Sequence, residues 1–140
     1  MEYPAAFPQR YSPAAPRRVL LVEDDPEMRA LMALTLRGDG HDVSEAQDGA
    51  EALDVLGTSS PDGRAHIDLV VSDVRMPGCS GLEVLERLRS GPSGIPVILV
   101  TAFSDRQTHA EARRLGAVVL DKPFDLGELR AMVLDVLQAH

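Results

Sequence analysis

Apolar and polar positions follow two different periods along this chain. Four short runs rich in Val, Ile and Leu are bounded by polar residues, a pattern typical of strands buried on both faces of a parallel sheet. A fifth segment, His41–Ala46, alternates polar and apolar residues, as expected for an edge strand. The four apolar runs are Val19–Val22, Ile67–Ser72, Ile95–Val100 and Ala117–Asp121.

Amphipathic segments lie between the predicted strands. The first has Pro26 at a position typical of a first helical turn and Gly38 where a helix would stop. Its apolar stripe comprises Met28, Leu31, Met32, Thr35 and Leu36. Five strands alternating with five helices indicate an α/β fold with a doubly wound parallel sheet. The other four helices are predicted over about Ala50–Leu56, Gly81–Arg89, Asp105–Leu115 and Asp125–Gln138.

The first 17 residues differ in composition from the rest of the chain. They carry four prolines among alanines, with Tyr3, Phe7 and Tyr11 scattered between them. Proline removes backbone donors and favours extended conformations. We interpret residues 1–17 as a flexible extension, either without further role or serving as a docking peptide, and residues 18–140 as one domain.

Charge and cysteine content exclude several classes of protein. The net charge of −8 makes duplex nucleic acid and anionic membranes poor partners. No apolar stretch approaches the roughly 20 residues of a spanning helix, and no signal-peptide pattern opens the chain. Cys79 is the single cysteine, so no disulfide framework or thiolate metal site can form. A soluble cytoplasmic protein is the plain interpretation.

Chemically reactive side chains follow each of the four apolar runs. Glu23, Asp24 and Asp25 follow the first, and Asp73, Thr101 and Lys122 follow the others. Ligands of open parallel α/β sheets bind beyond the carboxyl ends of the strands, so we expect these side chains to converge. Carboxylates, a hydroxyl and the chain's only lysine gathered there would suit magnesium-assisted handling of a phosphoryl group.

The predicted acidic cluster favours a cation. Two carboxylates about 4 Å apart repel by about 4 kcal/mol at an effective dielectric constant near 20. Magnesium prefers hard oxygen ligands, which Glu23, Asp24 and Asp73 would supply if the first and third strands are neighbours. Asp25 has two interpretations, as the N-cap of the first helix or as a further ligand, and Pro26 after it favours the cap.

Four segments together resemble the receiver domains of two-component response regulators. LLVEDDPEMR, VVSDVRMPGCSGLEVL, PVILVTAFSD and DKPF are similar to the signature segments of this family, in the same order and at matching spacing. The resemblance extends from about Arg18 to the C-terminus and is closest to stand-alone receivers of the chemotaxis-regulator kind. It implies a flavodoxin-like sheet with strand order 2-1-3-4-5.

The resemblance also implies a role for each matching residue. Asp73 would accept a phosphoryl group from a sensor histidine kinase or a histidine phosphotransfer protein. Glu23, Asp24, Asp73 and the backbone carbonyl of Arg75 would hold Mg²⁺. Lys122 would place its ammonium against the phosphoryl oxygens, and Thr101 would hydrogen-bond one of them after transfer. Without the resemblance, Lys122 reads as a solvated surface residue and Thr101 as an ordinary strand end.

Three further expectations come from the same comparison with the family. The Lys122–Pro123 bond would be cis, as is typical of the family. The switch position three residues before the lysine is usually aromatic but here is Val119, which puts the usual coupling between the threonine and an aromatic ring in doubt. We expect Phe103, two residues after Thr101, to substitute in part for this aromatic ring. Phe103 and Arg75 are both large and would shield the site from water, so we predict slow autodephosphorylation.

The function expected from the sequence is a phosphorylation-driven switch that acts through protein contacts, not an enzyme beyond its own phosphorylation and dephosphorylation. Apolar residues of the last helix exceed one buried stripe, which indicates either a well-buried helix or a face for a homodimer or a downstream partner. Two alternatives remain: a Mg²⁺-dependent phosphohydrolase of small molecules, and a receiver-like binding module independent of phosphorylation.

Overall fold

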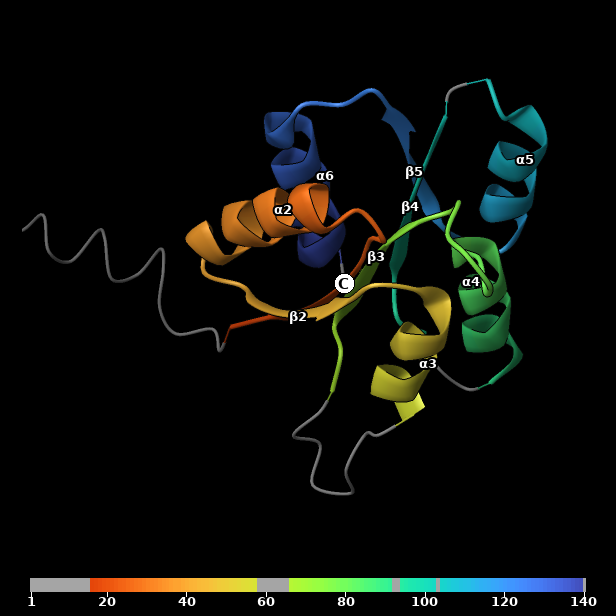
Figure 1. The fold of residues 1–140 in the computed structure, drawn as a ribbon, viewed down its shortest axis with the longest axis horizontal. Helices are drawn as coiled ribbons and strands as arrows, with labels where there is room; N and C mark the ends of the chain where they lie inside the picture. The colour runs from red at the N-terminus through yellow and green to blue at the C-terminus, as the bar shows by residue number, and fades with distance from the viewer. Residues whose placement is uncertain (1–15, 58–65, 92–93, 103, 140) are drawn as a thin grey trace, which may run out of the picture.

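The computed structural model describes residues 16–57, 66–91, 94–102 and 104–139. Within these ranges a parallel five-stranded sheet has the order β2-β1-β3-β4-β5, which confirms the predicted fold (Figure 1). The strands are β1 (Arg18–Val22), β2 (Asp42–Ala46), β3 (Leu69–Asp73), β4 (Val97–Ala102) and β5 (Val118–Lys122). The helices are α2 (Pro26–Gly38), α3 (Gly49–Gly57), α4 (Gly81–Ser90), α5 (Arg106–Arg114) and α6 (Leu126–Gln138).

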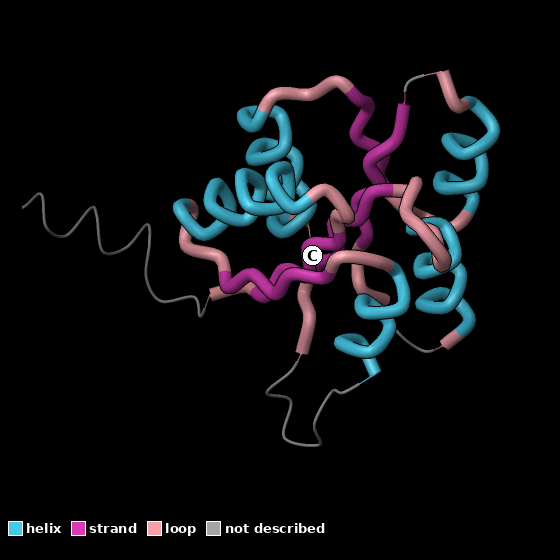
Figure 2. The backbone as a smooth tube through the Cα atoms, viewed as in Figure 1, coloured by secondary structure: helices cyan, strands magenta, loops and turns pink. Residues whose placement is uncertain are grey.

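Helices cover both faces of the sheet (Figure 2), and an apolar core lies on each face. Successive side chains of a strand point to opposite faces, so Leu20 and Val70 pack with α3, α4 and α5, while Leu21 and Val71 pack with α2 and α6. All of β3 is buried. The central strands therefore read as continuous apolar runs because both of their faces are covered.

The strand ends differ slightly from the sequence prediction. β4 begins at Val97 instead of Ile95, since Pro96 has no N–H to donate to a neighbouring strand. The strand also runs further, so that Thr101 pairs in register with Asp121 and Ala102 with Lys122. Thr101 and Lys122, the two predicted site residues among these, thus belong to the sheet itself, which fixes their positions more tightly than a loop would.

Side-chain caps begin four of the helices, and that of α5 is Asp105, which accepts from the N–H of Thr108 (3.2 Å). Asp25 is the N-cap of α2, as its position before Pro26 indicates, and accepts hydrogen bonds from the N–H groups of Glu27 (3.0 Å) and Met28 (3.5 Å). Capping boxes open α4 and α6, where Ser80 and Asp125 act as the N-caps. Each helix therefore starts at a defined place beside the carboxyl edge of the sheet.

The buried face of α2 is narrower than the predicted stripe. Met32, Ala33 and Leu36 are buried, as expected of residues that face the sheet and α6. Met28 and Leu31, which the helical spacing placed in the same stripe, are 38% and 50% exposed. Met28 and Leu31 lie at the edge of the apolar face of α2, where the sheet no longer covers them.

Two glycines allow close contact of backbone segments next to β3. A Cβ at Gly81 would overlap the carbonyl oxygen of Asp73 and lie 2.9 Å from the Ser72 hydroxyl oxygen. A Cβ at Gly49 would overlap the carbonyl oxygen of Cys79. The loop between β3 and α4 is therefore packed directly against α3 on one side and the first turn of α4 on the other.

Arginine side chains join the far ends of several elements. Arg89 on α4 donates from Nε to the carbonyl oxygen of Leu115 (2.7 Å) and from Nη1 to that of Ile95 (2.9 Å). Arg17 donates to the Leu137 carbonyl oxygen near the end of α6 (3.0 Å).

Residues 1–15 of the predicted extension lie outside the described ranges. No helix within those ranges combines the length and apolarity needed to cross a bilayer.

Candidate functional site

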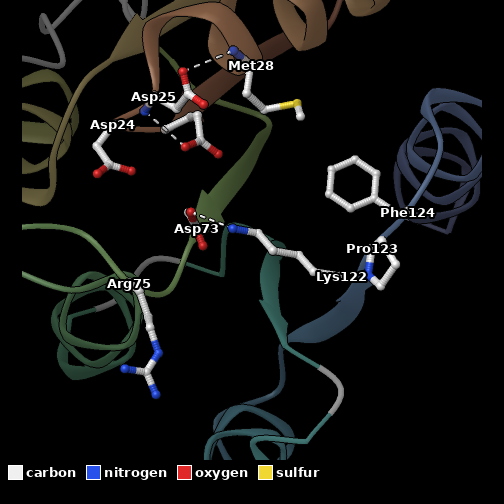
Figure 3. Close-up of a pocket in the computed structure, with 9 residues that line it drawn as sticks. Asp24, Asp25, Met28, Asp73, Arg75, Lys122, Pro123 and Phe124 are labelled. Carbon is white, nitrogen blue, oxygen red and sulfur yellow. Dashed lines mark hydrogen bonds and ion pairs between the residues drawn. The ribbon is translucent and has the colours of Figure 1, made fainter.

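A cleft of about 610 Å³ opens at the carboxyl ends of β1, β3 and β5. It lies where the strand order reverses direction between β1 and β3, the place where ligands of such sheets bind. The residues that line it are Glu23, Asp24, Asp25, Met28, Asp73, Arg75, Lys122, Pro123 and Phe124 (Figure 3).

Three carboxylates gather in this cleft, as predicted from the strand ends. Glu23 and Asp73 are 4% and 5% exposed, whereas Asp24 is exposed. One oxygen from each of the three side chains lies within 4.8 Å of the others. Buried carboxylates at this separation repel one another, so the cluster is suited to a bound cation.

Glu23 is held firmly by its neighbours. Its N–H donates to the carbonyl oxygen of Ala46 (3.0 Å), and its Oε2 accepts from the N–H of Asp25 (3.0 Å). Arg29 on α2 donates to the Glu23 carbonyl oxygen (2.8 Å). Backbone and side chain are both fixed, so the carboxylate cannot easily turn away from the cluster.

The surroundings of Glu23 raise the pKa of its carboxyl group above the ordinary value of 4.5. Burial is the main cause, and the negative charge of Asp73 adds to it. The hydrogen bond from the Asp25 N–H and the positive charge of Lys122 act in the opposite direction but do not cancel the increase. The site therefore disfavours its own full negative charge when no cation is bound.

Lys122 points into the cleft from the end of β5 and contacts Asp73. Its Nζ lies 2.9 Å from Asp73 Oδ2, within hydrogen-bonding distance (Figure 3). The Lys122–Pro123 peptide bond is cis, which agrees with the expectation from the family. The ammonium group thus already faces the carboxylate to which a phosphoryl group would be attached.

Thr101 lies on β4, the strand next to the one that carries Asp73, and pairs in register with Asp121 on β5. The side chain is 2% exposed, and its hydroxyl oxygen has no hydrogen-bond partner among the described residues. A buried hydroxyl normally has such a partner. The hydroxyl therefore has a donor free within the described residues, although Thr101 is not among the residues that line the cleft.

Arg75 lines the cleft, but its side chain does not face the carboxylates. It points away from Asp73 in Figure 3, is 82% exposed, and its Nη2 lies 3.7 Å from Asp105 Oδ2. Val119, at the expected switch position, is half-buried against the core shared with α3, α4 and α5. Phe103, for which we expected a substitute role, lies outside the described residues.

Sequence reasoning missed the apolar part of the cleft. Met28 and Phe124 line it, and Pro123 separates Phe124 from Lys122 (Figure 3). Met28 was assigned to the buried stripe of α2 by its spacing, and Phe124 was noted only as part of the DKPF segment, without a role in the site. The one available signal was their nearness in sequence to Asp25 and Lys122, because residues that follow strand ends tend to surround the site.

The residues present fit a magnesium ion. Hard oxygen ligands come from Glu23, Asp24 and Asp73, two of them buried, and the open cleft leaves room for the waters that Mg²⁺ usually retains. The raised pKa of Glu23 shows the electrostatic cost that a divalent cation would remove. Asp25 is engaged as a helix cap, so it contributes charge rather than a well-placed ligand.

Comparison with known proteins agrees with this arrangement. The family model of the response regulator receiver domain matches residues 19–134. The chain is 35% identical to the regulatory protein AtoC of Escherichia coli over 86% of its own length, and spans 25% of that protein. It is 32% identical to sporulation initiation phosphotransferase F of Bacillus subtilis, covering 83% of this chain and 90% of that one.

Solved structures give the same result. The chemotaxis response regulator CheY4 of Vibrio cholerae superposes with a TM-score of 0.75 at 30% identity, over 86% of this chain and 98% of that chain. Fold and sequence agree along most of the chain. The chain therefore belongs to the family of response regulator receiver domains.

Proposed function

We propose that this protein accepts a phosphoryl group on Asp73 from a sensor histidine kinase or a histidine phosphotransfer protein. The observation that carries the proposal is the position of Asp73, a buried carboxylate in an acidic cluster with a lysine ammonium at 2.9 Å, on the strand next to the one that carries the unpartnered Thr101 hydroxyl. These groups supply a nucleophile, a place for a cation and two donors for phosphoryl oxygens. Family membership supports the same assignment.

The reaction follows from these groups. A carboxylate oxygen of Asp73 attacks phosphorus, an O–P bond forms, and the P–N bond of the donor phosphohistidine breaks with its electron pair left on the imidazole nitrogen. Lys122 keeps its proton and turns from the carboxylate to a phosphoryl oxygen, while the Thr101 hydroxyl donates to another. Both donors then contact phosphoryl oxygens, whose negative charge is present on Asp73 only after transfer.

A metal site completes the proposal. Glu23, Asp24, Asp73 and the backbone carbonyl of Arg75 would hold Mg²⁺, which supplies charge neutralisation for the phosphoryl oxygens when bound.

We expect the large Arg75 side chain to slow autodephosphorylation, although its pairing with Asp105 leaves it turned from the carboxylates. An Arg75→Ala variant with an unchanged phosphoryl lifetime would remove this expectation.

The output is proposed to be a change in protein contacts, in the cytoplasm. Val118 on β5 and Leu134 on α6 are 40% and 52% exposed, which supports an interaction face on the last strand and helix for a second copy or a downstream partner. Four apolar side chains of α6 are buried against α2 and the sheet, so the exposed apolar face is small; they are Leu129, Val133, Val136 and Leu137. The proposed domain is 18–140, and the proposed extension 1–17 meets it at Arg17, which donates to the Leu137 carbonyl oxygen.

Intact-mass spectrometry with Mg²⁺ and acetyl phosphate tests the proposal. We expect the wild type to gain one phosphoryl group, Asp73→Ala to gain none, and Asp54→Ala, which removes an exposed aspartate on α3, to behave as the wild type. Without an adduct, when Mg²⁺ binding is verified separately, a phosphorylation-independent module becomes the better interpretation. Continuous phosphate release from varied small substrates would instead favour a phosphohydrolase.

A further inference from the structure

The imidazole of His109 joins two elements at the rim of the candidate site. His109 lies on α5, and its side chain is 12% exposed. The ring Nδ1 lies 2.6 Å from the carbonyl oxygen of Asp105, the residue that caps α5. The ring Nε2 lies 2.5 Å from Oδ1 of Asp121 on β5. One ring therefore bridges the start of α5 and the end of β5.

The two partners determine the protonation state of this ring. A backbone carbonyl oxygen can only accept a hydrogen bond, and so can an ionised carboxylate. Both ring nitrogens must donate if both contacts are hydrogen bonds, and only the imidazolium has two N–H groups. A neutral ring would satisfy one partner and place a lone pair against the other oxygen. The bridge is therefore complete only when His109 is charged.

Both ends of the bridge lead to residues of the candidate site. Asp121 precedes Lys122 and pairs in register with Thr101. Asp105 accepts hydrogen bonds from the N–H and hydroxyl of Thr108 (3.2 and 2.7 Å), and it also pairs with Arg75, which lines the cleft. The imidazolium thus connects the strand that carries Lys122 with the helix that follows Thr101.

The charges around the ring favour its protonated form. The hydrogen bond to the Asp105 carbonyl and that to Asp121 raise the pKa of His109 above 6.5, against the opposing effects of burial and of Arg113 on the same helix. Arg75, in the loop after β3, affects the His109 ring indirectly, through its ion pair with Asp105. Helix α4, which also packs against α5, places Glu83, Glu86 and Arg87 at exposed positions.

We infer that His109 is a positioning residue: as an imidazolium it holds the start of α5 to the end of β5 beside Lys122, and it releases α5 when it loses its proton. The bridge is fully formed below the ordinary histidine pKa and is lost as the pH rises through the higher pKa of the folded protein. Its effect on phosphoryl handling rests on the proposed function, whereas the bridge itself does not.

Histidine NMR in the absence of Mg²⁺ and phosphodonor tests the protonation state. We expect the His109 ring to titrate above the ordinary histidine value, with both nitrogens protonated below its pKa, and to titrate lower in Asp121→Asn. A short unstructured peptide with one histidine serves as the reference. A wild-type His109 that titrates at or below the peptide value would overturn the inference.

Amide hydrogen exchange tests the positioning role. After correction for intrinsic exchange, protection of the α5 amides in the wild type should fall by roughly 3- to 10-fold as the pH rises through the His109 pKa, the change expected for one charge-assisted hydrogen bond at a partly exposed position. His109→Gln should be poorly protected at every pH, and His66→Gln should behave as the wild type. A pH profile of His109→Gln equal to that of the wild type would refute the role.

Labelling with acetyl phosphate separates this inference from the proposed function. If Asp73 is labelled, the pH profile of the labelling rate in His109→Gln should lose the step that the wild type shows at the His109 pKa, while the Mg²⁺ requirement is kept. Identical profiles would mean that the bridge has no influence on Lys122. Absence of any label in both proteins would count against the proposed function and leave the NMR and exchange results to decide on the bridge.

Discussion

Replacement of Thr101 by valine is expected to stabilise the resting protein. The Thr101 side chain is 2% exposed on β4, and its hydroxyl oxygen has no hydrogen-bond partner within the described part of the chain. Valine has nearly the same shape as threonine and favours strands. The substitution removes a buried polar group without creating a cavity, so the usual loss of stability in a core should be reversed in sign.

The magnitude follows from the cost of burying a hydroxyl group. An unsatisfied buried donor costs about 1–3 kcal/mol relative to its state in water. Part of this cost is relieved by small movements around the site, so we expect the free energy of unfolding to rise by about 1 kcal/mol. Thr108→Val provides the matched control, because the Thr108 hydroxyl donates to Asp105 Oδ2 at 2.7 Å. That variant should lose about 1 kcal/mol.

Urea unfolding in a metal-free buffer measures both changes. Parallel slopes for the three proteins would allow the midpoints to be compared directly. If Thr101→Val is destabilised as much as Thr108→Val, the Thr101 hydroxyl has a partner in the folded protein, and the reasoning is wrong. Under the proposed function the stabilised variant should also lose its donor to the phosphoryl group, so stability and signalling would move in opposite directions.

Three further predictions concern the same edge of the sheet. With EDTA present, Glu23→Gln should be more stable than the wild type at pH 7, because the pKa of Glu23 is raised in the folded protein. The wild type should gain stability as the pH falls from that raised pKa towards 4.5. The urea midpoints of the two proteins should therefore converge near pH 4.5. Gly81→Ala should cost about 2 kcal/mol or more, since its Cβ would overlap the Asp73 carbonyl oxygen, and an unchanged midpoint in thermal unfolding would contradict the packing. Arg89→Ala should cost about 1–3 kcal/mol by loss of the bonds to Leu115 and Ile95, whereas the exposed Arg87→Ala should change urea stability by less than about 0.5 kcal/mol.

The strands and their order could be predicted because both depend on local pattern and on a shared topology. Runs of Val, Ile and Leu bounded by polar residues located each strand to within about two residues, and the family resemblance supplied the order. The start of β4 was placed too early because the apolar Ile95 precedes Pro96, and the missing N–H matters only once the neighbouring strand is known. The α2 stripe was too wide because spacing alone does not show where the sheet ends.

The site was predictable as a set of residues but not as a network. The convergence of Glu23, Asp73 and Lys122 follows from parallel strands that end at one edge. The contact between His109 and Asp121 does not, because it depends on the rotation of α5 about its axis and on a side chain in the middle of a helix. The turn of Arg75 towards Asp105 likewise depends on a choice of rotamer, which a long exposed side chain makes at little energetic cost.

The two glycine contacts beside β3 make the rims of the cleft unequal in stiffness. On the α3 and α4 side, backbone atoms around Gly49 and Gly81 are in direct contact with the loop that follows Asp73, and no rotamer change can relax them. On the α5 side, the connections pass through the side chains of Arg75, Asp105 and His109. Under the proposed function, charge added at Asp73 should therefore deform the α5 side, and substitutions that retune the response can accumulate there while Asp73 stays in place.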